Sequence, residues 1–192
     1  MNLRNLISKN AGGRIVLLLF LLSSIIYAMM LTITIPKVVS FSGGMKLLDM
    51  IPTGYNAAYV NLLLSALGEQ GRHAYLFKQI PLDMIYPALF AVSNCLIIAY
   101  ILKKLGKSDG SLFYFCFLPL FAGIFDYCEN IGIITLLMTF PDVSEMMAQT
   151  TNVFSLLKSS FTTAYFLFLI GLLITWGYVS FFGKDKMNTR NV

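Results

Sequence analysis

The sequence predicts an all-α, polytopic membrane protein, a four-transmembrane-helix bundle with an amphipathic helical outer cap between the first two membrane helices. Apolar residues make up 57% of its 192 residues and charged residues only 12%, a balance typical of integral membrane proteins. Four runs have the roughly 20 residues that an apolar helix needs to cross a bilayer. These runs cover residues 14–35, 81–102, 112–140 and 161–182. We therefore expect residues 1–192 to form one integral membrane domain.

The first run follows a basic stretch that contains Arg4 and Lys9. A secretory signal peptide starts in the same way, but its apolar part spans about 7–15 residues and ends at a small-x-small cleavage site. The run here is longer and has no clear site of that kind. Residues 14–35 are therefore interpreted as a membrane helix.

Residues 36–80 connect the first two spans and show a helical periodicity of their own. Thr53 or Asn56 can cap a helix there, because a side-chain oxygen at the N-cap accepts a hydrogen bond from the first turn. The residues at helical spacing are Tyr59, Val60, Leu63, Leu64 and Leu67. Their apolar face must be buried in the headgroup region or against the bundle. We predict an outer cap, with an interfacial linker as the alternative.

The end of the cap leads directly into the second span. Gly68 and Gly71 are expected to interrupt the cap helix, and residues 72–79 then form a second piece. Pro81 follows, and proline is favoured in the first turn of a helix. Because the next connection, 103–111, is short, spans two and three are expected to be antiparallel neighbours.

Asp83 lies in the first turn of the second span, where the positive end of the helix dipole stabilises a carboxylate. Helix capping alone explains such a residue. A functional interpretation comes from Tyr86 one turn later and Asn94 on nearly the same face. Pro87 lacks an amide hydrogen, so it is expected to kink the helix and open its outer end.

The third span contains two carboxyls, Asp126 and Glu129, in an otherwise apolar stretch. A carboxylate in hydrocarbon costs at least about 2.5–3.5 kcal/mol, so a pair needs an offsetting reason. Asn130 shares their helix face, while Gly123 and Gly132 flank them and permit close approach of another helix. The pair suits acid/base chemistry or a proton relay, and the alternative is a polar contact that holds helices together.

Residues 141–160 are expected to form an outer loop before the fourth span. Hydroxyl side chains then gather at the outer level of that span: Ser159, Ser160, Thr162, Thr163 and Tyr165. They are expected to line a polar cavity with the three carboxyls, although hydroxyls in membrane helices commonly bond to the backbone instead.

Arg72 and His73 belong to the predicted cap. The Arg72 guanidinium can pair with a carboxylate or hold a lipid phosphate. The alternative is that Arg72 is only a surface charge in contact with solvent or headgroups. His73 is the only histidine, and a zinc centre usually requires several His or Cys ligands, so no metal or cofactor is expected. A hard-cation site built from the three carboxylates is a minor option.

The three cysteines all fall within predicted spans, on two different helices. Cys95, Cys116 and Cys128 are therefore interpreted as small buried apolar residues, not as a structural disulfide. Nucleophilic catalysis by Cys128 is not expected, because neighbouring carboxyls disfavour the thiolate. The sequence also lacks a glycine-rich phosphate loop, a Gly-x-Ser-x-Gly elbow and a His-Glu-x-x-His motif.

Basic residues near the span ends predict the orientation. One side of the membrane collects Arg4, Lys9, Arg14, Lys103, Lys104, Lys107, Lys184, Lys186 and Arg190, whereas the other has Lys37, Lys46, Arg72, Lys78 and Lys158 over many more residues. We expect a multi-pass protein of the plasma (inner) membrane with both termini in the cytoplasm. The net charge of +5 forms no basic stripe interleaved with aromatics, so nucleic acid is not an expected partner.

Short polar motifs run through residues 55–135: Gly71-Arg72-x-x-Tyr75, Leu82-Asp83, Pro87 and Asp126-x-x-Glu129-Asn130. Together they resemble a family of small, uncharacterised, multi-pass (four-helix) integral membrane proteins. The resemblance implies a four-helix membrane fold and no assigned activity, and it marks as polar positions Arg72, Tyr75, Asp83, Asp126, Glu129 and Asn130. The four-span aspartyl signal peptidase also carries two acids near the outer face, but on different helices and in motifs not found here.

The sequence therefore favours a membrane-embedded enzyme that processes a lipid or isoprenoid with an intramembrane carboxyl pair as acid and base. The alternative is a non-enzymatic carrier or assembly factor whose carboxylates bind a proton, a cation or a partner helix. The expected catalytic residues are Asp126, Glu129 and Asp83, and the expected substrate-binding residues are Arg72, His73, Tyr75, Tyr86, Asn130 and Thr163. Membrane lipids and a lipid-like substrate are the expected partners.

Overall fold

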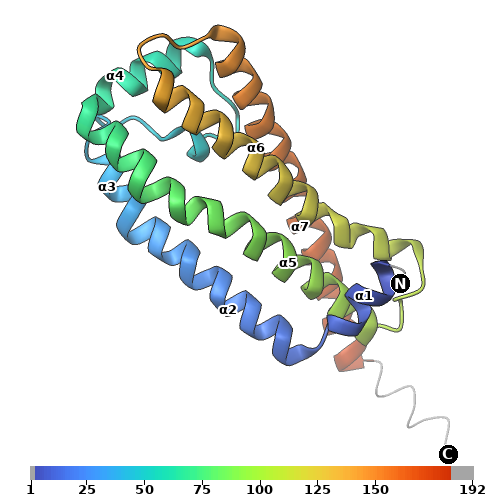
Figure 1. The fold of residues 1–192 in the computed structure, drawn as a ribbon. Helices are drawn as coiled ribbons and strands as arrows, with labels where there is room; N and C mark the ends of the chain where they lie inside the picture. Colours follow the sequence, from blue (N-terminus) through green and yellow to red (C-terminus); the bar gives the residue numbers. More distant parts are fainter. Residues whose placement is uncertain (1–2, 183–192) are drawn as a thin grey trace, which may run out of the picture.

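A computed structural model describes residues 3–182, which fold into an elongated bundle of helices without a strand (Figure 1). The α-helices are α1 (Leu3–Asn10), α2 (Gly13–Met29), α3 (Ile35–Val39), α4 (Ala57–Ala74), α5 (Ile80–Lys104), α6 (Leu118–Thr139) and α7 (Glu145–Phe182). The π-helical segments are η1 (Met30–Thr34) and η3 (Tyr75–Gln79), and the 3₁₀-helices are η2 (Leu48–Met50) and η4 (Ser111–Phe117). Three basic residues used to orient the C-terminus lie outside the described residues: Lys184, Lys186 and Arg190.

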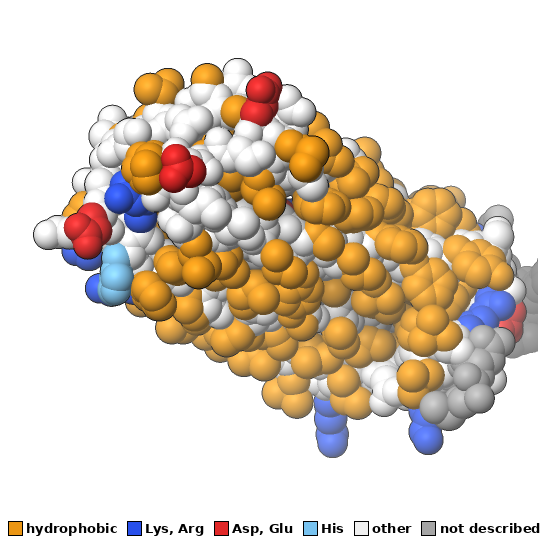
Figure 2. Space-filling view, turned by 45° about the horizontal axis from the view of Figure 1, so that its top comes forward, with side chains coloured by type: hydrophobic (Ala, Val, Ile, Leu, Met, Phe, Trp, Pro, Cys, Tyr) orange, Lys and Arg blue, Asp and Glu red, His pale blue; other side chains and the backbone are white. Residues whose placement is uncertain are grey.

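Within residues 3–182, four helical stretches are long and apolar enough to cross a membrane, which confirms the predicted fold class. They are Gly13–Val39, Ala57–Lys104, Ser111–Thr139 and Glu145–Phe181. Figure 2 shows hydrophobic side chains covering the visible flank of the bundle, with charged side chains gathered toward its two ends. Large apolar side chains along α2 and α7 are exposed, as lipid-facing residues would be. The chain is a multi-pass membrane protein.

The four long helices pack as an arc. α5 contacts both α2 and α6, and α6 makes its most extensive contacts with α7. Within residues 3–182, α2 and α7 make at most marginal contact with each other. One side of the bundle, between α2 and α7, is therefore not closed by helix packing.

Two glycines of α6 allow close helix contacts, as predicted. A Cβ atom at Gly123 would lie 2.9 Å from the carbonyl oxygen of Pro87 on α5. One at Gly132 would lie 2.7 Å from Cγ2 of Thr151 on α7. Because real Cβ atoms essentially never come this close to such atoms, only glycine allows α6 to approach both neighbours in the present geometry.

The cap lies at the end of the bundle opposite α1 (Figure 1). Asn56 caps α4, since its Oδ1 accepts a hydrogen bond of 2.9 Å from the amide of Tyr59. The predicted apolar face is buried at Val60, Leu63, Leu64 and Leu67. It packs against the bundle, which confirms the predicted amphipathic cap.

The expected double interruption after the cap helix is only half correct. Gly68 breaks the helix with a φ of 58°, a conformation that favours glycine. Gly71 remains helical and packs against Phe41. From residue 69 the helix continues through η3 into α5, so the second spanning stretch starts well before Pro81 and the separate cap is shorter than residues 36–80.

The predicted loop at residues 141–160 is wrong, because α7 already begins at Glu145. Its first turns alternate between exposed residues such as Met146 and Val153 and buried ones such as Ala148, Thr151 and Ser155. Two of these buried residues are polar, which lowers the hydropathy of a segment that is nevertheless packed against α6. Pro87 lies inside α5, which continues as a helix to Lys104.

Candidate functional site

The centre of the candidate site is a lysine of α7 held between two carboxyls of α6. The Lys158 ammonium lies 3.0 Å from Asp126 Oδ1 and 2.6 Å from Glu129 Oε2. The Glu129 side chain is 1% exposed and the Lys158 side chain 21% exposed. The i, i+3 spacing places both acids on one face of α6, as predicted from the sequence, and α6 presents that face to α7.

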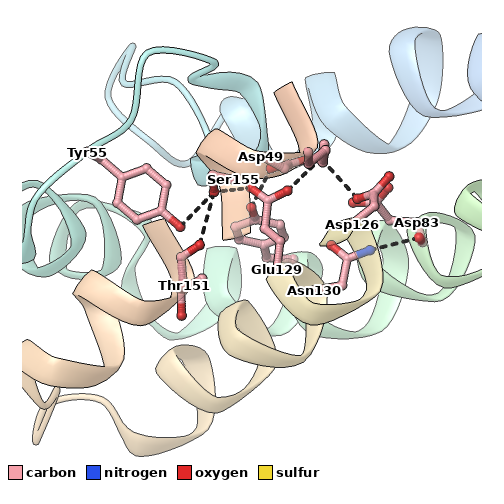
Figure 3. A network of polar contacts seen from close by, with 10 residues as sticks. Asp49, Tyr55, Asp83, Asp126, Glu129, Asn130, Thr151 and Ser155 are labelled. Atoms are coloured by element: carbon pink, nitrogen blue, oxygen red, sulfur yellow. Dashed lines mark hydrogen bonds and ion pairs between the residues drawn. The ribbon is translucent and has the colours of Figure 1, made fainter. Parts of the chain in front are cut away.

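Glu129 is fixed from a second direction by hydroxyl groups (Figure 3). Ser155, almost one helical turn before Lys158, donates a 2.5 Å hydrogen bond to Glu129 Oε1, and its Oγ lies 3.2 Å from the Tyr55 hydroxyl. Burial raises the pKa of Tyr55, so this residue keeps its phenolic proton. The backbone amide of Tyr55 donates in turn to Asn152 Oδ1 at 2.7 Å. The residues preceding α4 are thus tied to α7.

Asp49 brings a further carboxyl to the site from η2 in the cap. The Tyr75 hydroxyl donates a 2.5 Å hydrogen bond to Asp49 Oδ1. Burial raises the pKa of the Asp49 carboxyl above its ordinary value of 3.8, while the nearby positive charge of Lys158 partly offsets this rise. Asp49 therefore holds its proton to a higher pH than a surface aspartate does.

Asp83 on α5 completes the group of carboxyls, and no hydrogen bond to its side chain is found within residues 3–182. The residue is 3% exposed, and its Oδ2 atom accepts no hydrogen bond in the structure. The main-chain carbonyl of Asp83, by contrast, accepts a 2.9 Å hydrogen bond from Asn130 Nδ2. Asn130 lies one residue after Glu129, so this bond links α5 to the acidic face of α6.

The site thus contains four carboxyls and, among the described residues, one lysine that pairs with two of them. Within residues 3–182, Lys158 is the one basic side chain within ion-pair distance of Asp126 and Glu129, and no basic side chain lies within that distance of Asp49 or Asp83. Burying several uncompensated negative charges is very unfavourable. The arrangement therefore favours a state in which part of the cluster is protonated, as acid/base chemistry or proton binding requires.

A cavity of about 340 Å³ opens beside this cluster, and three of the carboxyls and the lysine face it. The polar lining residues are Asp49, Asp83, Asp126, Lys158 and Thr162, and the aromatic ones are Tyr27, Tyr86 and Phe90. Met30, Leu31, Ile35, Met50 and Ala122 complete the wall. Glu129 is not among the lining residues, so of the three predicted catalytic acids only Asp83 and Asp126 reach the open space.

The predicted substrate-binding residues divide into three groups. Tyr86 lines the cavity. Tyr75 and Asn130 are fully buried behind it and hold Asp49 and the Asp83 carbonyl in place. Their role in this geometry is to position the acids.

The remaining three, Arg72, His73 and Thr163, lie outside this cavity. Arg72 donates a 2.8 Å hydrogen bond to the Leu64 carbonyl and stacks over Phe140, so it secures the helix break at Gly68. No ion pair joins Arg72 to a carboxylate within the described part of the chain. The expected pairing of Arg72 with a carboxylate is therefore not found here, because its guanidinium satisfies the carbonyl at the break instead.

His73 packs against Phe77, with ring centroids 4.6 Å apart, and lines a separate depression on the cap. Thr163 is exposed and lines another shallow depression with Ser159 and Ser160. The expected hydroxyl lining of the acidic cavity therefore reduces to Thr162, because a helix can turn only one face inward.

Sequence reasoning missed Lys158, Asp49 and Ser155 as members of the site. Lys158 follows two leucines and Asp49 lies between apolar residues, so each is a charge in an apolar setting. That setting is a usable signal, because a buried charge requires a partner. Pairing them with Asp126 and Glu129 requires knowing which helices are neighbours.

Among residues 3–182 no three His, Cys, Asp or Glu side chains converge on a point that could hold a metal ion. The hard-cation alternative thus finds no ligand set in this part of the chain. The cysteines Cys95, Cys116 and Cys128 are free, and the first two are buried in the apolar core at the other end of the bundle.

Searches for similar proteins give no match to a family model, a curated protein or a solved structure. The function is therefore argued from the geometry and chemistry of the site.

Proposed function

We propose that this chain is a membrane-embedded enzyme that processes a lipid or isoprenoid, with the intramembrane carboxyls as acid and base. The observation that carries this proposal is the cavity at the carboxyls, which has room for a reacting group. An assembly factor that used the acids only to bind a partner helix would bury them at a helix contact without such a space.

A second cavity supports lateral entry from the membrane. It measures about 350 Å³ and shares Tyr27, Tyr86, Phe90 and Thr162 with the first. Its other lining residues come from α2, α5 and α7: Phe20, Ser23, Ser24, Asn94, Ile97, Tyr165, Phe166 and Leu169. It therefore lies at the side where α2 and α7 do not pack together. A hydrocarbon chain in this second cavity would place its polar end at the acids.

Two of the acids have environments that suit opposite roles. Asp126 is paired with the Lys158 ammonium, which stabilises its ionised form and suits a base. Asp83 has an unpartnered Oδ2 and no cation within ion-pair distance, which suits a protonated acid. Glu129 and Ser155 stay behind the cavity wall and position Lys158. In this assignment the substrate loses a proton to Asp126 and receives one from Asp83.

A non-enzymatic carrier is the second candidate, because a carrier would also need a lipid-accessible cavity with proton-binding groups. The two functions differ in whether the bound lipid is changed. Membrane lipids are the proposed partners in both cases, and the plasma (inner) membrane is the proposed location.

The test is to reconstitute the purified protein in nanodiscs made from a total membrane lipid extract and to follow the lipid composition by mass spectrometry. We expect one lipid class to be depleted and a product to appear, with loss of this conversion in Asp83→Asn and Asp126→Asn. The exposed Asp142 provides the matched control, Asp142→Asn, which is expected to act as wild type. An unchanged lipid composition, together with lipid that co-purifies in the cavity, would contradict the enzyme and favour the carrier.

A further inference from the structure

We infer that the acidic cavity receives the cationic amine of a single-chain lipid, whose hydrocarbon chain occupies the second cavity between α2 and α7. This inference rests on the proposed function only in treating the two cavities as the site of one lipid. It adds the charge and size of the ligand, which the acid/base assignment leaves open.

The first argument is the charge of the wall. Asp49, Asp83 and Asp126 face the cavity together with one basic residue, Lys158. The Lys158 ammonium already donates to Asp126 and Glu129, so at most one of its three N–H bonds remains for a ligand. A phosphate or carboxylate would meet three acids, and Lys158 would offer it at most one N–H donor beside the hydroxyls of Tyr27, Tyr86 and Thr162. An ammonium would instead donate to carboxyl oxygens of this wall and be attracted by those that are ionised.

The second argument is the unpartnered oxygen of Asp83. Its Oδ2 atom is buried without a hydrogen bond, although Asp83 lines the open cavity and is 3% exposed. Leaving a buried carboxyl oxygen unsatisfied is unfavourable. A ligand N–H group placed in the cavity would satisfy it with a charge-assisted hydrogen bond.

The third argument is the aromatic wall next to the acids. The Tyr27 and Tyr86 rings are stacked with centroids 5.3 Å apart, and the Tyr86 and Phe90 centroids are 5.7 Å apart. These three rings belong to the lining of both cavities. Aromatic faces attract cations and also pack against hydrocarbon, so they suit the junction between an amine and its chain.

The size of the cavities points to one chain. Each measures about 340–350 Å³, near the lower end of the roughly 300–1,000 Å³ found for ligand sites. The polar cavity leaves little room beyond a small head group. The second cavity lies between helices that are themselves exposed to lipid, so a chain can enter it sideways.

The inference is tested by binding of a set of amphiphiles to the full-length protein in nanodiscs, by native mass spectrometry. The probes are hexadecylamine, hexadecanol and hexadecyl phosphate, with butylamine as the amine without a long chain. We expect hexadecylamine to bind at least about tenfold more tightly than the other three, because the charged hydrogen bond and the buried chain both contribute. Equal binding of the alcohol or tighter binding of the phosphate would overturn the proposed charge. Equal binding of butylamine and hexadecylamine would show that the hydrocarbon chain does not contribute and would overturn the assignment of a lipid ligand.

Two pairs of variants separate the head-group site from the chain site. Asp83→Asn, or Asp49→Asn if the first variant does not fold, is expected to weaken hexadecylamine binding about tenfold and to leave hexadecanol unchanged. Asp142→Asn is the matched control. Ser24→Phe fills the second cavity and is expected to weaken the binding of hexadecylamine and hexadecanol about equally. Ile25→Phe, at an exposed position outside that cavity, is expected to leave the binding of both probes unchanged. No effect of either acid variant on amine binding would contradict the inference.

These binding results do not depend on turnover. Tight amine binding without conversion of any lipid would contradict the enzyme and leave the amine site intact. Conversion of a lipid without a preference for the amine would support the enzyme and contradict the amine site.

Discussion

The side-chain amide of Asn130 donates a 2.9 Å hydrogen bond to the main-chain carbonyl of Asp83. In a regular helix that carbonyl would accept from the amide four residues later, but residue 87 is a proline and has no amide hydrogen. Asn130 on α6 therefore supplies the donor that Pro87 removes from α5. The bond also fixes the acidic face of α6 against the start of α5, where Asp83 faces the cavity.

This relationship predicts a coupling between two substitutions. Asn130→Ala is expected to lower the free energy of unfolding by about 1–3 kcal/mol, because it leaves the buried Asp83 carbonyl without a donor. In a Pro87→Ala background the restored helix amide can serve that carbonyl, so the same substitution is expected to cost less. Thermal unfolding of the four proteins in detergent gives the coupling free energy. Additive effects would contradict the proposed compensation.

A second prediction concerns Lys158. Lys158→Met is expected to lower the free energy of unfolding by about 3–5 kcal/mol, because it leaves Asp126 and Glu129 buried without their cation. Adding Asp126→Asn and Glu129→Gln to the same chain removes those charges and is expected to restore much of the loss. Lys107→Met, at an exposed lysine, is the control. If Lys158→Met were as stable as the wild type, the ion pairs of Lys158 with Asp126 and Glu129 would have no structural role.

The close contact of α6 with α7 gives a third prediction. Gly132→Ala is expected to destabilise the protein by about 1–3 kcal/mol, because the added Cβ overlaps the Thr151 side chain. Gly171→Ala is the matched control, since no atom outside its own helix backbone lies within 4 Å of a Cβ built there. Replacing glycine by alanine in that helix is expected to be neutral or stabilising. Equal melting temperatures of the two variants would contradict the packing described here.

The pKa of Asp49 predicts how stability depends on pH. In the unfolded chain this carboxyl ionises near its ordinary value of 3.8, whereas burial raises the pKa in the fold. Between these two values the folded state binds more protons than the unfolded state, so this group's contribution to stability falls as pH rises. Asp49→Asn keeps an oxygen that can accept from Tyr75 but does not ionise.

The melting temperature of Asp49→Asn relative to wild type is therefore expected to rise with pH from about 4 upward, until the folded carboxyl has ionised. The measurement is thermal unfolding of both proteins in detergent across this range. A difference that is constant with pH, or that falls as pH rises, would show that the fold does not retain the Asp49 proton.

The orientation in the membrane can be tested with topology reporters. Lys107 lies in the turn near α1, where Arg4 donates a 3.2 Å hydrogen bond to the Gly110 carbonyl. Ser144 lies just before α7, and α6 separates it from that turn. From the charge bias we expect a reporter at Lys107 in the cytoplasm and one at Ser144 outside. An outside signal at Lys107 would reverse the proposed orientation and place the cap in the cytoplasm.

The sequence by itself determined the features that depend on residues close together in the chain. Hydropathy over about 20 residues is enough to find the four spans, and capping side chains are enough to place the start of the cap helix at Thr53 or Asn56, of which the structure uses Asn56. The shared face of Asp126 and Glu129 follows from the helical repeat, and a glycine break after the cap helix was predictable, although the sequence did not separate Gly68 from Gly71. None of these features depends on which helices are neighbours.

Only the tertiary structure decided what the acids face. Lys158 was expected in a loop, and it reaches Asp126 and Glu129 because α7 begins early and packs along α6. Asp49 approaches Lys158 because η2 packs against α6, and Arg72 turns away because the broken helix at Gly68 offers it a carbonyl. The separation of these partners in the chain ranges from 8 residues, for Arg72 and Leu64, to more than 100 residues, for Asp49 and Lys158. Hydropathy and periodicity describe one helix at a time, whereas a buried charge is stabilised by whichever helix packs against it.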